Sequence, residues 1–125
     1  MPKTPAEVTD TELAILVVLW ERGPCQIRDI VEALYARHTP ALHATVKSLL
    51  ERLTDKGFVA CDRRRFAHTF SPLTTREAYV GRQLQKLADS HFDGSLAPML
   101  LTLIDRVKLS RREREAIRKI IEGVD

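Results

Sequence analysis

The stretch TPALHATVKSLLERLTDKG, Thr39–Gly57, decides the fold that this sequence predicts. Thr39 is a good N-cap, and Pro40 suits the first helical turn, where its missing N–H removes no hydrogen bond. An apolar stripe at helical spacing follows, made of Leu42, Val46, Leu49, Leu50 and Leu53. Gly57 is expected to end the helix in a left-handed conformation. The stretch therefore predicts one amphipathic helix that packs through its leucine side.

The opposite face of this helix is small, polar and cationic. At about 100° per residue, the residues opposite the stripe, with two more on its flanks, are His43, Ala44, Lys47, Ser48, Glu51, Thr45 and Arg52. Short polar groups and cations can approach DNA base edges and phosphates without a bulky obstruction. We interpret the stretch as a recognition helix that enters a DNA groove. An ordinary helix with a solvated outer face is the alternative that this stretch leaves open.

The residues before the recognition helix predict two further helices. Thr9–Glu12 has the capping-box pattern that starts a helix, and Gly23-Pro24 ends it. Its inward stripe is expected to contain Leu13, Leu16, Val17 and Trp20. A second apolar stripe predicts a helix over Ile27–Arg37, followed by a short break before Pro40. Two helices joined by a short turn, the second polar on its outside, are typical of a helix-turn-helix.

A basic β-hairpin is predicted directly after the recognition helix. Phe58–Asp62 and Ala67–Ser71 are expected to be short strands, and Arg63, Arg64, Arg65 and Phe66 form the tip between them. A hairpin in this position is the wing of a winged helix. Its three arginines repel one another, and a densely negative partner would relieve that repulsion. They are predicted to touch the DNA backbone or a neighbouring minor groove, although a solvated turn is the simpler alternative.

The composition changes after residue 73, so we expect a winged-helix DNA-binding domain over 1–73 and a helical dimerisation domain over 74–125. Capping-box patterns at Thr74–Glu77 and Ser110–Glu113 begin two of its three predicted helices. Three amphipathic helices in so short a segment expose more apolar surface than the segment can bury by itself. Pairing with a second copy solves this, with packing against the first domain as the alternative. The residues predicted to dimerise are Val80, Leu84, Leu87, Leu96, Leu100, Leu103, Ile104, Ile117, Ile120 and Ile121.

Composition narrows the classes of function. The net charge is only +3, but the segment from Arg37 to Arg65 holds seven cations against three acids, which is consistent with a nucleic-acid footprint. Cys25 and Cys61 are far apart and lack a CxxC partner, and the four histidines show no metal-ligand spacing on a predicted helix. We expect no disulfide, metal or other cofactor. The longest apolar run is too short to span a bilayer and no signal peptide is recognisable, so a cytoplasmic protein is expected.

With these residues in view, the chain resembles the BlaI/MecI/CopY-type repressors, the penicillinase repressor family. The matching segments are TDTELAILVVLWERGP, ATVKSLLERLTDKGFV, RRRFAHTFSPL and HFDGSLAPMLLTLIDRVKLS. The resemblance implies a mainly α-helical protein, with an N-terminal winged helix-turn-helix and a C-terminal helical dimerisation domain. It further implies a homodimer that binds an inverted-repeat operator in double-stranded DNA and represses transcription. By the same resemblance, Thr45, Lys47, Ser48 and Arg52 fall at base and phosphate contacts.

The sequence also departs from the pattern of this family. Ala41 stands where many members carry Trp, and Thr102-Leu103 replaces the Asn-Phe bond that penicillin-responsive members have cut on induction. The paired-cysteine motif of the copper-responsive branch is absent from the sequence. Neither that cleavage nor copper sensing is therefore implied. An inducer or a protease that relieves repression would be a further partner, and the sequence does not identify it.

Two other classes of function compete with the repressor. A winged helix used only for protein–protein contact would be favoured by apolar residues on the outer face of the third helix, but that face is polar and cationic. An enzyme would need a constellation of catalytic side chains or a phosphate-binding glycine loop. His43 and Glu51 share a face but lie two helical turns apart, which is long for a catalytic pair. We therefore expect a DNA-binding protein without enzymatic activity.

Overall fold

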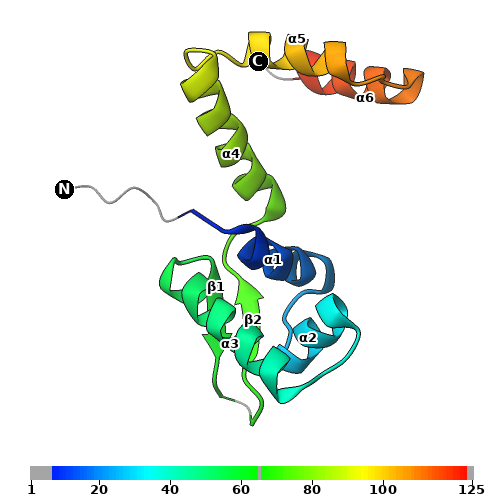
Figure 1. Cartoon of the computed structure of the whole chain (residues 1–125). Coiled ribbons are helices and arrows are strands. Elements are labelled where there is room, and N and C mark those ends of the chain that lie inside the picture. The colour runs from blue at the N-terminus through cyan, green and yellow to red at the C-terminus, as the bar shows by residue number, and fades with distance from the viewer. Residues whose placement is uncertain (1–6, 65, 124–125) are drawn as a thin grey trace, which may run out of the picture. The chain divides into compact units, whose positions relative to one another are not determined.

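The computed structural model describes residues 7–64 and 66–123, which form six helices and one two-stranded sheet. The chain divides into two compact units, residues 1–79 and 80–125, with the boundary inside helix α4, Arg76–His91. The first unit holds α1 (Asp10–Arg22), α2 (Ile27–Tyr35), α3 (Pro40–Asp55), β1 (Val59–Asp62) and β2 (Thr69–Pro72) (Figure 1). The second holds the rest of α4, with α5 (Leu96–Arg106) and α6 (Arg111–Glu122). The predicted helix-turn-helix followed by a hairpin is confirmed.

Helix α3 begins and ends as the sequence predicts. The Thr39 side chain accepts a hydrogen bond from the amide of Leu42 at its start. At its end, Gly57 has φ +87°, its amide donates to Thr54 and the amide of Phe58 donates to Leu53. This is a Schellman termination, in which the left-handed residue satisfies the last carbonyls of the helix. Val46, Leu50 and Leu53 are fully buried, so the predicted stripe faces the core.

Of the inward stripe predicted for α1, only Leu16 is fully buried. Ile15, Leu16, Val18 and Leu19 are buried, whereas Leu13, Val17 and Trp20 are only half-buried. The helix is covered on more than one side, so its apolar residues outnumber the positions on the stripe that faces the middle of the core. Trp20 lies at the edge, where its Nε1 donates to the carbonyl of Thr74 over 2.8 Å and its ring lies 5.7 Å from that of Tyr79.

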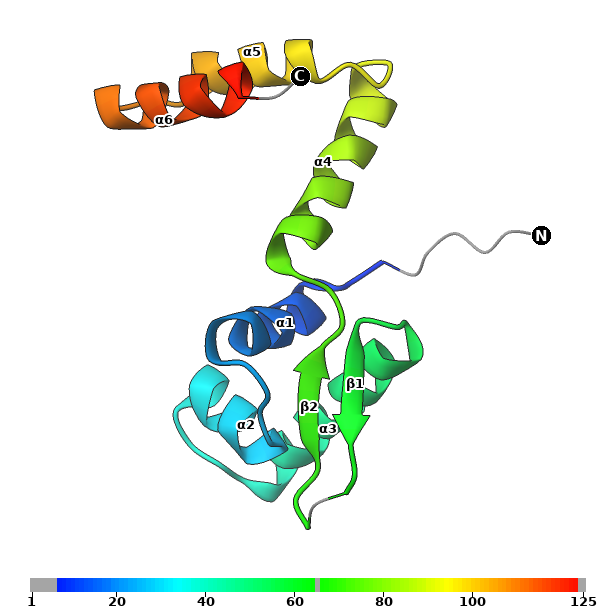
Figure 2. The same ribbon diagram turned by 180° about the vertical axis from the view of Figure 1, so that it is seen from behind.

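The hairpin is antiparallel, with Val59 opposite Pro72 and Asp62 opposite Thr69 (Figure 2). A backbone bridge joins it to the segment between α1 and α2, because Cys25 and Phe70 exchange two hydrogen bonds of 3.0 and 2.8 Å. Phe70 is buried in the same core as α1 and α3. The wing is therefore attached to the helices through both its backbone and a core side chain.

One predicted cap is wrong. The hydroxyl of Thr75, not Thr74, accepts from the amide of Ala78 and caps α4. The carbonyl of Thr74 instead accepts the hydrogen bond from the indole of Trp20, and α4 begins one residue later than the predicted cap implies. The capping boxes at Thr9–Glu12 and Ser110–Glu113 are confirmed.

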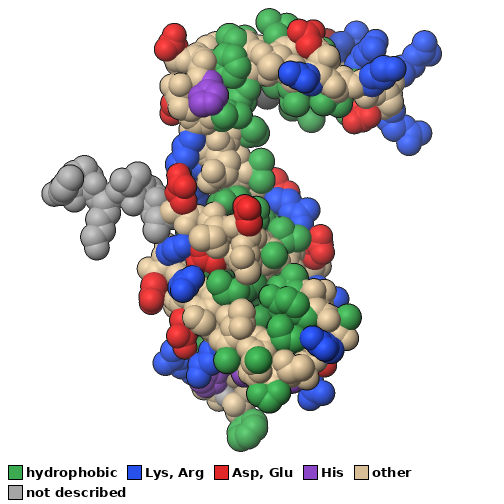
Figure 3. Space-filling model, viewed as in Figure 1, with side chains coloured by type: hydrophobic (Ala, Val, Ile, Leu, Met, Phe, Trp, Pro, Cys, Tyr) green, Lys and Arg blue, Asp and Glu red, His purple; other side chains and the backbone are tan. Residues whose placement is uncertain are grey.

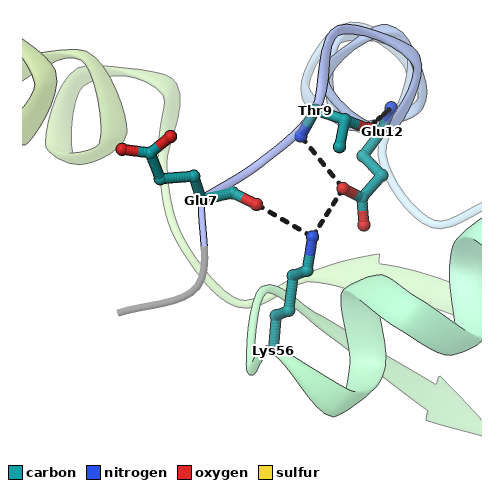
Figure 4. Close-up of polar contacts among 4 residues, drawn as sticks. All are labelled: Glu7, Thr9, Glu12 and Lys56. Carbon is teal, nitrogen blue, oxygen red and sulfur yellow. Dashed lines mark hydrogen bonds and ion pairs between the residues drawn. The ribbon is translucent and has the colours of Figure 1, made fainter. Parts of the chain in front are cut away.

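A buried ion pair joins the end of α3 to the start of α1 (Figure 4). Lys56 Nζ lies 2.6 Å from Oε1 of Glu12, whose side chain is fully buried, and 2.8 Å from the carbonyl oxygen of Glu7. The amide of Thr9 donates to the same Glu12 oxygen. Burial acts to raise the pKa of Glu12, but the hydrogen bonds from Lys56 and Thr9 outweigh it and lower the pKa below its usual 4.5. Lys56 was counted among the seven cations of the expected nucleic-acid footprint, but its ammonium group is paired with Glu12 within the fold.

We expect Lys56→Met to destabilise the first unit by roughly 3 kcal/mol at pH 7, because it leaves the Glu12 carboxylate buried without its cation. Glu12 has a lowered pKa in the folded chain, so its contribution is present above the unfolded pKa and is lost as the pH falls through the folded value. The deficit of the variant should therefore shrink as the pH is lowered from 7 toward about 4. Urea denaturation at several pH values measures this.

The double variant Glu12→Gln/Lys56→Met is the control, because it removes the charge as well as its partner. It should recover most of the stability lost in Lys56→Met. Equal stability of Lys56→Met and the parent at pH 7 would show that the pair does not hold the two helices.

Candidate nucleic-acid interface

The outer face of α3 is on the surface, as predicted. Ala44, Thr45, Lys47, Ser48 and Arg52 are exposed, and His43 is half-buried. The core stripe fixes which way this face points, because the leucines that oppose it cannot turn outward without losing their burial. That these six side chains contact DNA stays a prediction.

Thr45 carries a constraint that the sequence did not reveal. Its hydroxyl donates to the carbonyl of Ala41 over 3.0 Å, one turn earlier in the helix. While this hydrogen bond is made, Oγ1 is left to accept a hydrogen bond from a base, and the methyl group can pack on one. Cytosine and adenine amino groups and the thymine methyl group are the matching features in a major groove.

A cleft of about 410 Å³ lies between α2, the first half of α3 and the wing. Lys47 and His43 of α3 line it, opposite Phe66, Ala67 and His68 of the wing. Its remaining lining includes Arg28 from the first turn of α2 and His38 from the turn before α3. The cleft is therefore bordered by Lys47, by Arg28, whose Nε lies 3.1 Å from Oε1 of Glu32, and by imidazoles that can donate hydrogen bonds. Such groups suit a phosphate backbone. Arg28, His38 and His68 were missed in the sequence. The packing of α2 on α3 brings Arg28 to the cleft, the turn before α3 holds His38 there, and the folded wing brings His68.

Two of these histidines contact each other. His38 Nε2 lies 2.9 Å from His43 Nδ1, and the rings are nearly perpendicular at 88°. One ring donates a hydrogen bond and the other accepts it, and this contact holds both rings near the N-terminus of α3. Within residues 7–64 and 66–123 no three His, Cys, Asp or Glu side chains gather in a way that could hold a metal ion.

The charge along α3 changes from one end to the other. A second hollow, of about 370 Å³, adjoins the later half of the helix and is lined by Glu51 and Asp55 as well as by Arg63 of the wing. Lys47 and His68 line both hollows. Among the residues that the structure describes, no carboxylate lines the first hollow, whereas Glu51 and Asp55 offset the charges of Lys47 and Arg63 in the second. The first half of α3 is therefore the better place for phosphates. This agrees with the general geometry of recognition helices, whose N-terminal residues contact the base edges.

In the wing, Arg63 and Arg64 are exposed, whereas Arg65 lies outside the described residues. Arg64 is ordered by Asp62, which accepts from its backbone amide, from Nε at 3.0 Å and from Nη2 at 2.9 Å. The hydrogen bonds to Asp62 and its negative charge raise the pKa of Arg64. The guanidinium of Arg64 is thus paired with Asp62, which partly balances its charge.

The residues predicted to dimerise are all exposed in the chain as described, between 40% and 66% of their surface. Neither α5 nor α6 has a buried residue, and the two helices run side by side (Figures 1 and 2). Figure 3 shows hydrophobic side chains gathered along them on the face in view. The same stripes that periodicity places on one side of each helix are therefore uncovered.

No helix among the described residues is long and apolar enough to cross a membrane.

Comparison with known proteins places the chain in a family. The family model described as "Penicillinase repressor" matches residues 8–123. The transcriptional regulator BlaI of Mycobacterium tuberculosis is 33% identical over 118 residues, covering 93% of this chain and 83% of that protein. The penicillinase repressor of Bacillus licheniformis is 22% identical over 122 residues, covering 98% and 94%. A solved structure of Bordetella bronchiseptica BpsR covers 94% of this chain and 76% of its own, with a TM-score of 0.49 and 20% identity. This chain belongs to the penicillinase repressor family of transcriptional regulators.

Proposed function

We propose that the protein is a homodimer that binds an inverted-repeat operator and represses transcription from the promoter that contains it. Membership of a family of transcriptional repressors, and not of enzymes, gives the general activity. The observation that carries the finer proposal is the cationic cleft between α3 and the wing. It joins a polar helix face to a basic hairpin, and this combination suits double-stranded DNA better than a protein surface.

In the proposed complex, the first half of α3 lies in the major groove. Lys47 and Ser48 would reach base edges, with Thr45 accepting a hydrogen bond or packing on a thymine methyl group. Arg28, His38 and His68 would border the adjacent phosphates, and the arginines of the wing would lie on the backbone beyond. These contacts separate into those that read sequence and those that fix position.

The second copy would cover the apolar faces of α5 and α6. Twelve large apolar side chains after residue 79 are exposed in the chain as described. Apolar surface is stabilised by roughly 25 cal/mol for every Å² removed from water, so a partner with matching stripes is strongly favoured. An identical chain has such stripes, and a two-fold axis then places two recognition helices on two half-sites. Half-site centres should lie about 34–36 Å apart or at a multiple of that distance.

The proposal is tested by selecting bound duplexes from a random-sequence DNA pool at near-physiological salt. We expect enrichment of a two-fold-symmetric motif whose half-sites are spaced by whole helical turns. Unsymmetrical, weakly enriched DNA would contradict the dimeric operator, and a failure to retain any duplex at low salt would contradict DNA binding itself.

Replacing Arg63, Arg64 and Arg65 together by Ala should weaken operator binding and flatten the dependence of log affinity on log salt. Each phosphate that the protein no longer neutralises lowers that slope by about 0.9. Because Asp62 already balances Arg64, we expect the slope to fall by about 1 to 2 per subunit, and not by the full value for three cations. Fluorescence anisotropy titrations at several salt concentrations measure it.

The matched control replaces Arg111, Arg112 and Arg114 by Ala. It removes the same charge from the first turns of α6, where cations oppose the helix dipole and their loss should not destabilise the helix. A slope that flattens equally in both variants would mean that overall charge, not the wing, governs binding.

Leu103→Glu should shift the dimer toward monomer, raising its dissociation constant by a factor of about ten or more, because a carboxylate would have to enter the apolar interface. Thr102→Glu is the control, since it adds the same charge at the neighbouring position on the polar side of α5. Analytical ultracentrifugation over a range of concentrations compares the two. Dissociation of both variants to the same extent would count against the proposed face.

A further inference from the structure

Phe66, at the tip of the wing, lines the cleft but takes no part in the core. Its side chain is 107% exposed, as open to water as in an extended chain. The other aromatic residues of this region behave differently, since Phe70 is 6% exposed and Phe58 packs against the core. A hydrophobic side chain stands out from the end of the hairpin in Figure 3. Phe66 therefore contributes nothing to folding, and its apolar surface is available to a partner.

The surroundings of Phe66 are cationic. Arg63 and Arg64 are exposed in the same loop, and Phe66 lines the cleft that also contains Lys47 and His43 of the recognition helix. A protein partner for a lone exposed aromatic residue would need further apolar surface beside it. Here the neighbours are guanidinium groups, which are attracted to phosphates. The charge around the side chain thus points to a nucleic acid.

The two strands that lead into the tip of the hairpin are held by hydrogen bonds. The last strand pair is Asp62 opposite Thr69, and Asp62 also fixes the backbone and guanidinium of Arg64. Phe70 is bonded through its backbone to Cys25. Along the chain, Phe66 is separated from this last strand pair by three residues on one side and two on the other.

Resting on the proposed function, we propose that Phe66 is an apolar wedge that enters the minor groove beside each half-site and partly separates one base step. The minor groove of B-DNA is about 6 Å wide and 7.5 Å deep, which admits a loop tip that leads with an aromatic ring. Phe is among the side chains that proteins insert between base steps to kink a duplex. Arg63 and Arg64, which precede Phe66 in the loop, would lie on the phosphate backbone that borders the groove.

The wedge has a consequence for specificity. Pyrimidine–purine steps such as TA and CA separate more easily than other steps. DNA flanking each half-site should therefore be selected for such a step, although no hydrogen bond reads it. In selections from a random pool, Phe66→Ala should retain the central motif and lose this flanking preference.

The direct test uses the selected duplex with 2-aminopurine placed at successive flanking positions, because its fluorescence rises when it unstacks. The wild-type protein should raise the signal severalfold at one position on each flank. Phe66→Ala should abolish the rise and weaken binding about tenfold, with the salt slope unchanged because no charge is removed. Phe66→Leu, which keeps a smaller wedge, should retain part of both effects.

Leu73→Ala is the matched control, since Leu73 is 62% exposed and lies outside the tip. It should leave both the signal and the affinity as in the wild type. The wedge is overturned if the wild-type protein binds the duplex without any rise in fluorescence, or if Phe66→Ala matches the wild type in both readouts. A failure of the wild-type protein to bind any duplex would instead contradict the proposed function, so the two failures are distinguishable.

Discussion

The contact between Lys56 and Glu12 fixes the position of helix α3, which carries the proposed base contacts. It joins the residue that caps the end of α3 to a fully buried carboxylate in the first turn of α1. Oε2 of that carboxylate has no hydrogen-bond partner among the described residues, so Lys56 is its main source of compensation. Rotation of α3 by one residue, about 100°, would break this pair and expose the leucine stripe at once. The polar face that carries Lys47 and Ser48 is therefore held in one orientation.

The wing depends on a second constraint, the backbone bridge between Cys25 and Phe70. The bridge extends the hairpin to the segment before α2 and so brings the loop after β1 beside the first turns of α2 and α3. Without it, the cations of α2 and the imidazoles at the start of α3 would have no opposite wall. The cleft is lined by α2, by the first half of α3 and by the wing. It keeps one shape because each of these three segments is attached to the core.

The sequence predicts those features that are local. The cap at Thr39, the left-handed Gly57 and the hairpin can be read from neighbouring residues, and all were confirmed. Features decided by tertiary contact could not be read in this way. The choice of Thr75 as cap depends on Trp20, more than fifty residues away, and the role of Lys56 depends on Glu12. Arg28 likewise comes to the cleft only when α2 packs on α3, and His68 only when the wing has folded.

The two units differ in how much of their apolar surface is buried, and this difference suggests how repression is relieved. The first unit buries a complete core, whereas α5 and α6 bury none of their residues. In the proposed dimer, joining two DNA-binding units raises the affinity for an inverted repeat well above that of one unit, because the second half-site is bound at high effective concentration. Operator affinity is then linked to dimerisation, since any agent that favours separated chains must weaken DNA binding by the same free energy. A signal could therefore act on the helices after residue 79 and release the operator without altering a single residue of α3 or the wing.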